Sequence, residues 1–411
     1  MHSKFLLAIA LALSWPVRSK AAESSGGLMV TLASVADRVR AQNPDLAAAR
    51  QRIGEALGRM HQAGRRENPR LQTEVEHNTR TSEGSVKLGF VQRFPVTNRL
   101  RFEKELSVRE LNAAEAEVRD VERKLVAAAR EELVKILALR SQRELLREQA
   151  ALCGKLAGFI EQAVAKGEGS PLDAGQAKLE AAKLAIEIRQ LDAAEAAAIG
   201  ALKPLLGMNP SAALAPGGEL PPVRVPHAEA GSSRRPDLQA ARVEADAAAL
   251  EVDLERSKKF EDIEVGVFGR AGRRIDEPGG AEGEGMIGFQ LSIPLPLWSD
   301  NSGNIEAARA KLERKRLEAA ALDRNIRNEA EAARAEMVRW AALERELRVE
   351  LLPLADRQTE LAEQTWRNGQ GELQVVLKAR EQRLELASSR LDALRDFHLA
   401  RVRYDAAVHQ R

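Results

Sequence analysis

The sequence NPDLAAAR at residues 43–50 is repeated as RPDLQAAR at residues 235–242, which indicates an internal duplication. Two further matches follow in the same order. Leu88-Gly89-Phe90 is echoed by Ile287-Gly288-Phe289, and Gly167-Glu168-Gly169 by Gly369-Gln370-Gly371. Three landmarks in one order indicate two structurally equivalent halves. We expect the first repeat over residues 22–209, the second over 227–411, and a Pro- and Gly-rich linker over 210–226.

The first residues are typical of a signal peptide. Lys4 precedes the apolar run Phe5 to Leu13, and Ser19-Lys20-Ala21 places small residues at the positions that a signal peptidase reads. We therefore expect residues 1–21 to be removed on export. Cys153 is the only cysteine, so neither a disulfide framework nor an amino-terminal lipid anchor is expected.

The composition indicates long packed helices and excludes a nucleic-acid partner. The 63 basic and 61 acidic residues nearly cancel, so no basic field attracts nucleic acid, and only 3% of residues are aromatic. Helical patterns run over about 98–165 and 304–367, with shorter return helices over 171–206 and 373–409. At 1.5 Å per residue the long helices would extend roughly 100 Å, too far for one compact domain.

Between these helices the pattern changes to alternation, which predicts strands over about 71–78, 85–94, 262–270 and 285–294. Each pair has one apolar and one polar side, at a length that fits a tilted strand in a bilayer. Edge hairpins of a soluble sheet are the alternative. Aromatic residues in or beside the strands favour the membrane as an interfacial belt: Phe90, Phe94, Phe102, Phe260, Phe268, Phe289 and Trp298.

The order of these elements resembles the TolC family of bacterial outer-membrane efflux channels over the whole mature chain. The most specific stretch is GFQLSIPLPL at residues 288–297, together with the glycine-marked ends of the long helices. Asn43-Pro44-Asp45 and the segment 62–69 are similar to the heavy-metal cation efflux branch.

The resemblance implies a mainly helical protein with membrane β-structure. Three copies would pool twelve strands into an outer-membrane β-barrel that continues into a periplasmic α-helical barrel. The partners would be a homotrimer, a periplasmic adaptor, an inner-membrane resistance-nodulation-division pump and outer-membrane lipid. The function would be a passive exit duct for heavy-metal cations or other small toxic solutes; drug efflux and type I protein secretion are alternatives within the family.

By position, the resemblance also assigns the helical tips to adaptor docking and gating: Gly167, Glu168, Ser170, Asp173, Gly369, Gly371 and Glu372. The aspartates that narrow the entrance of the best-known member align with Val375 and Lys378, so an acidic ring is not expected there. On the polar strand faces we expect residues that line the barrel lumen: Gln72, Glu74, Glu76, Lys87, Gln290 and Ser292.

No enzyme, cofactor or resident metal is expected. None of the six histidines is paired at a metal-ligand spacing, and no phosphate loop, dinucleotide fingerprint or nucleophile elbow occurs. Two non-channel functions compete with the duct: a periplasmic adaptor, which should carry one helical hairpin flanked by β-rich modules, and a structural coiled-coil protein, which leaves the alternating strands unexplained.

Overall fold

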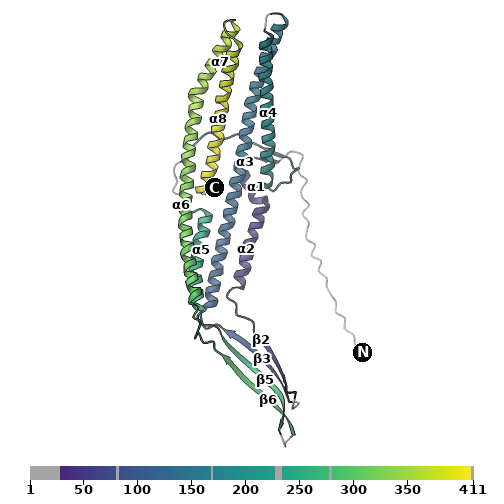
Figure 1. Ribbon diagram of the computed structural model, residues 1–411, viewed down its shortest axis with the longest axis vertical. Coiled ribbons are helices and arrows are strands. Elements are labelled where there is room, and N and C mark those ends of the chain that lie inside the picture. Colours follow the sequence, from purple (N-terminus) through teal and green to yellow (C-terminus); the bar gives the residue numbers. More distant parts are fainter. Residues whose placement is uncertain (1–27, 80–82, 168–169, 227–233, 277–279, 409–411) are drawn as a thin grey trace, which may run out of the picture.

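A computed structural model describes residues 28–79, 83–167, 170–226, 234–276 and 280–408. The molecule is elongated, with long helices running from a β-sheet at one end to two helical hairpin tips at the other (Figure 1). Residues 1–21, the expected signal peptide, lie outside the described residues.

Both halves have the same order of elements. The first contains α1 (Val35–Gln42), α2 (Pro44–Gln62), β2 (Arg70–His77), β3 (Gly84–Phe94), α3 (Arg99–Ala165) and α4 (Pro171–Leu205). The second contains α5 (Pro236–Ser257), β5 (Ile263–Asp276), β6 (Gly280–Ser292), α6 (Ser302–Glu346), η2 (Leu347–Leu351), α7 (Leu352–Arg367) and α8 (Leu373–Val408). The helices that carry the repeated motif, α2 and α5, begin in the same way, with Pro44 and Pro236 in their first turns.

The second hairpin is longer than the sequence predicted. Strands were expected over 262–270 and 285–294, with a loop between, but β5 continues to Asp276 and β6 already begins at Gly280. The glycine-rich, charged residues of the expected loop are paired across the strands, for example Gly272 with Glu284 and Arg274 with Glu282. Their composition resembles a loop because both faces of this extension lack a continuous apolar row.

The second long helix contains Pro353. It continues from α6 through the π-helical segment η2 into α7. Leu352 N–H donates to the Leu347 carbonyl, one residue further back than in an α-helix. This wider turn accommodates a proline, which has no N–H and crowds the preceding turn, without ending the helix.

The helices form antiparallel pairs, with α3 packed on α4 and α6 packed on α8. The halves join where α3 also contacts α5 and α8. One core lies between α1, α3 and α4, around Leu133, Ile136 and Leu202, and another lies between α6 and α8, around Met337 and Tyr404. Each of these large side chains contributes roughly 1.5–3 kcal/mol by burial.

A small parallel sheet fastens the linker to the start of the described chain. β1 (Leu28–Val30) pairs with β4 (Leu214–Pro216), with Leu28 opposite Leu214. The linker therefore contains a strand that its proline and glycine content did not predict. Within the described ranges, no helix combines the length and apolar character needed to cross a membrane.

Candidate functional site

The four long strands form one antiparallel sheet in the order β2-β3-β5-β6, so the strands of the two halves meet between β3 and β5. Residues directly opposite each other in such a pair point to the same face. Leu71 is opposite Phe90, Phe90 is opposite Val267, and Val267 is opposite Phe289. This face is apolar although it is open to its surroundings: Phe289 is 83% exposed and Ile287 is 82% exposed.

The six residues predicted to line a lumen lie together on the opposite face. Glu74 is opposite Lys87, and Gln72 is opposite Gly89. Glu76 alternates with Glu74 along β2. On β6, Gln290 is opposite Gly266 and Ser292 is opposite Glu264, and the β3–β5 register places those partners on the same face as Lys87. The two sides of the sheet therefore differ as alternation predicted.

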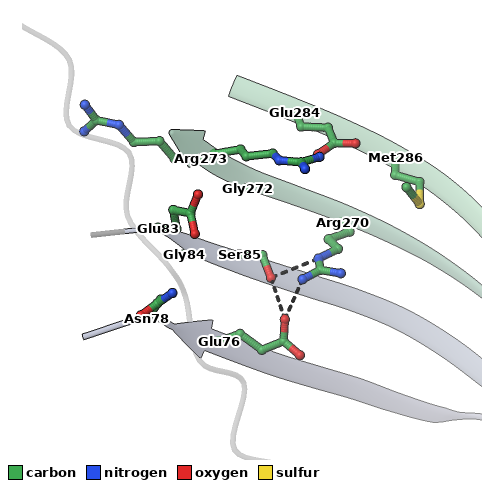
Figure 2. Close-up of a pocket in the computed structure, with 11 residues that line it drawn as sticks. Glu76, Asn78, Glu83, Gly84, Ser85, Arg270, Gly272, Arg273, Glu284 and Met286 are labelled. Atoms are coloured by element: carbon green, nitrogen blue, oxygen red, sulfur yellow. Dashed lines mark hydrogen bonds and ion pairs between the residues drawn. The ribbon is translucent and has the colours of Figure 1, made fainter. Parts of the chain in front are cut away.

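Charged side chains on the polar face pair across the strands. Lys87 Nζ lies 3.3 Å from Glu74 Oε2, and Arg93 Nε lies 3.2 Å from Glu264 Oε2. Near the far end of the sheet, Arg270 reaches across β3 and binds Glu76 on β2 (Figure 2). Sequence reasoning missed Arg270 because it lay at the end of the predicted strand, although alternation from Phe268 would have placed it on this face.

Phe268 corrects the predicted aromatic belt. It is opposite Gly288, on the polar face, and not on the apolar face with Phe289. Its ring covers Gly288, where an added Cβ would lie only 2.4 Å from Phe268 Cζ. Lys87 Nζ lies 4.6 Å from the centre of the same ring, within the range of a cation–π contact.

At the other end of the molecule, Gly167 and Gly369 end the long helices in the left-handed region, with φ of 77° and 72°. Gly369 N–H donates to the Trp366 carbonyl at 3.0 Å, and Gln370 N–H donates to the Thr365 carbonyl at 3.0 Å, which closes the last helical turn. Glycine suits both positions because side chains disfavour this backbone region. Glu168, predicted beside Gly167, lies outside the described residues.

The other predicted tip residues lie at the starts of the return helices. Ser170 occupies the N-cap position of α4 with an extended backbone, but its hydroxyl makes no capping hydrogen bond. Asp173 lies in the first turn of α4, where a negative charge is favoured by the helix dipole. Gly371 and the exposed Glu372 immediately precede α8.

The two tips pack against each other, which places the predicted docking residues of both halves in one region. Their shared core is formed by Ala157, Ile160, Ala174, Ala177 and Leu373. Phe159 of α3 and Trp366 of α7 make an edge-to-face contact, with ring centres 6.1 Å apart. Sequence reasoning missed this pair because the contact joins residues from separate repeats.

The described residues contain no group of three or more His, Cys, Asp or Glu side chains arranged to hold a metal ion. Cys153 is buried, and burial raises the pKa of its thiol. A thiol held protonated in this way is a poor nucleophile and a poor ligand.

The model of the outer membrane efflux protein family matches residues 35–208 and 231–407, most of the chain. The chain is 26% identical over 296 residues to the cobalt-zinc-cadmium resistance protein CzcC of Cupriavidus metallidurans, covering 70% of this chain and 67% of that protein.

Solved structures share the fold. Crystal structures of CusC match with a TM-score of 0.76 and 18% identity, covering 92% of this chain and 91% of that chain. The outer membrane protein VceC of Vibrio cholerae matches with a TM-score of 0.74 and 19% identity, covering 92% and 95%.

Proposed function

This chain belongs to the outer membrane efflux protein family, and we propose that three copies of it form the passive exit duct of a tripartite exporter. It is an outer-membrane efflux protein, as its sequence resemblance predicted. The proposal adds the number of chains, the route through them, the partners and the cargo.

The observation that carries the proposal is the sheet with two exposed faces of opposite character. Phe289 and Ile287 lie bare on one side, and paired charges lie on the other. Among the described strands, β2 and β6 each have one neighbour, so both edges of the sheet are open there. In lipid, open edges would leave backbone groups unpaired. Joining four strands from each of three chains closes a ring of twelve, with the apolar face toward lipid and the polar face around water.

The long helices supply the periplasmic part of the duct. α3 contains 67 residues, which at 1.5 Å per residue gives roughly 100 Å. Arranged around the same threefold axis, these helices would continue the barrel as an α-helical tunnel and carry the tips away from the outer membrane (Figure 1).

The tips are the proposed docking and gating end. Gly167, Ser170 and Asp173 of the first half and Gly369, Gly371 and Glu372 of the second lie at the end furthest from the sheet. A periplasmic adaptor would contact them, and an inner-membrane resistance-nodulation-division pump would supply the energy. Glu168 belongs to this proposal by its sequence position.

Heavy-metal cations are the proposed cargo. The similarity to a cobalt-zinc-cadmium resistance protein and the branch features at residues 43–45 and 62–69 support it. A duct must release what it conducts, so tight binding sites along the path are not required.

The central experiment is gene deletion followed by complementation. The deletion strain should become sensitive to zinc, cobalt or cadmium and regain resistance with the wild-type gene, and the protein should be extracted from outer membranes as a trimer. Sensitivity to drugs alone would refute the metal cargo. Recovery as a periplasmic monomer, or no single-channel steps in planar bilayers, would refute the duct and favour the adaptor or structural coiled-coil reading.

A further inference from the structure

Cross-strand ion pairs cancel charge along the polar face of the sheet. Lys87 of β3 pairs with Glu74 of β2, and Arg93 of β3 pairs with Glu264 of β5. The pair furthest from the helices, Arg270 with Glu76, joins β5 to β2 across the intervening strand. In each of these three pairs a basic group therefore lies beside a carboxylate.

The Arg270 pair has the most extensive geometry. Arg270 Nε donates to Ser85 Oγ at 2.9 Å, and Ser85 Oγ donates to Glu76 Oε2 at 3.1 Å, while the Arg270 guanidinium also binds that oxygen directly. Three strands and both repeats meet in this triangle, which lies in a hollow at the end of the sheet (Figure 2).

Stability does not account for the placement of this pair. The side chains of Arg270 and Glu76 are 46% and 55% exposed, and exposed ion pairs contribute little to folding. The described lining of the hollow contains three carboxylates, Glu76, Glu83 and Glu284, and three guanidinium groups, Arg270, Arg273 and Arg274, so the loss of one of them changes its net charge by one unit. Rings of side-chain charge are what give pores their preference for cations or anions.

We propose that Arg270 sets the charge selectivity of the outer mouth of the duct by neutralising Glu76. The inference rests on the proposed function, in which the polar face surrounds the path of the cargo. With Arg270 present, the mouth passes ions of either sign. Without it, three uncompensated Glu76 carboxylates, one from each chain, would attract cations and repel anions.

Coulomb's law gives the size of the effect. A unit charge ~8 Å from a passing ion changes the local concentration of that ion about twofold even at the dielectric constant of bulk water. Because cation and anion respond in opposite directions, the ratio of K⁺ to Cl⁻ permeability should change by the square of that factor, roughly fourfold to sixfold for one charge at this distance. The change should shrink as salt is raised, since the Debye length is about 10 Å at 0.1 M and about 3 Å at 1 M.

The experiment measures reversal potentials of single channels in planar bilayers under a KCl gradient. Arg270→Ala should raise the K⁺ to Cl⁻ permeability ratio, Glu76→Gln should lower it, and the double variant should return close to wild type. Arg101→Ala is the control, because it removes a positive charge from α3, outside the sheet and outside the lining of the hollow. Arg270→Lys, which keeps the charge, should behave like wild type.

Two failures are distinguishable. If the wild-type trimer conducts and Arg270→Ala conducts with unchanged selectivity, the inference is wrong and the duct stands. If the wild-type protein forms no channels, the proposed function fails and the inference fails with it. Should Arg270→Ala not assemble, Arg270→Gln carries the same prediction with a side chain that can still reach Ser85.

Discussion

Replacing Gly369 by proline tests the role of the tips. Gly369 has a φ of 72°, whereas the proline ring fixes φ near −65°. Proline also removes the N–H that donates to the Trp366 carbonyl at 3.0 Å. The left-handed conformation costs an ordinary residue roughly 1–2 kcal/mol, and the lost hydrogen bond costs about 1 kcal/mol more. Because proline cannot adopt this φ at all, we expect the turn to reorganise, which displaces Gly371 and Glu372.

This damage should remain local. No atom lies within 4 Å of a Cβ added at Gly369, so the backbone conformation is the only obstacle to a side chain there. The sheet lies at the opposite end of the molecule (Figure 1). We therefore expect Gly369→Pro to insert and trimerise normally but to abolish export.

The assay compares metal resistance in a complemented deletion strain with the amount of heat-resistant trimer on a gel of outer-membrane extract. Gly369→Asn is the matched control, because asparagine tolerates the left-handed region and retains the N–H; it should restore most of the resistance. Full resistance in Gly369→Pro would remove the tip from the docking role. Loss of the trimer would instead show that the tip is needed for assembly.

Three further predictions concern the sheet, the helical core and the linker. Phe289→Arg should cost about 2–4 kcal/mol per chain at the bilayer midplane and prevent insertion. Gln290→Arg, on the polar face, should insert, and outer-membrane fractionation measures both. Equal insertion of the two variants would contradict the assignment of faces. Met337→Ala should destabilise the helices by about 2–5 kcal/mol because Met337 is fully buried. Leu317→Ala, at an exposed position of α6, should have little effect on the thermal unfolding midpoint measured by circular dichroism. Similar midpoints for the two variants would count against the core between α6 and α8. Burial lowers the pKa of His398, whose Nε2–H donates to the Pro221 carbonyl. The contribution of neutral His398 to stability is therefore present above the unfolded pKa of about 6.5 and is lost as pH falls below it. Protease cleavage of the linker should rise between pH 7.5 and 5.5 in wild type and change less in His398→Asn.

The sequence was sufficient for the features that depend on local pattern. Alternation predicted which residues of β2 and β3 share a face, and the register places Glu74 opposite Lys87 as that pattern requires. Glycines predicted the ends of the long helices, because Gly167 and Gly369 adopt the backbone conformation that glycine favours.

What sequence reasoning missed depends on contacts between distant segments. Residues 271–276 were expected in a loop because their glycines and charges show no apolar row, yet they extend β5 through pairing with β6. β1 and β4 have three residues each, too few for a periodic signal, and exist because they pair with each other. The π-helical turn that precedes Pro353 was not predicted, because it depends on the geometry of the surrounding helix.

The short parallel sheet has a consequence for biogenesis. Leu28 cannot meet its partner Leu214 until the whole first repeat has emerged from the export machinery. Pairing between such distant positions is slow to form, because a long loop must close before any contact rewards it. This two-stranded sheet of β1 and β4 should therefore be among the last parts of the molecule to form, and until then residues 28–30 have no strand partner at residues 214–216.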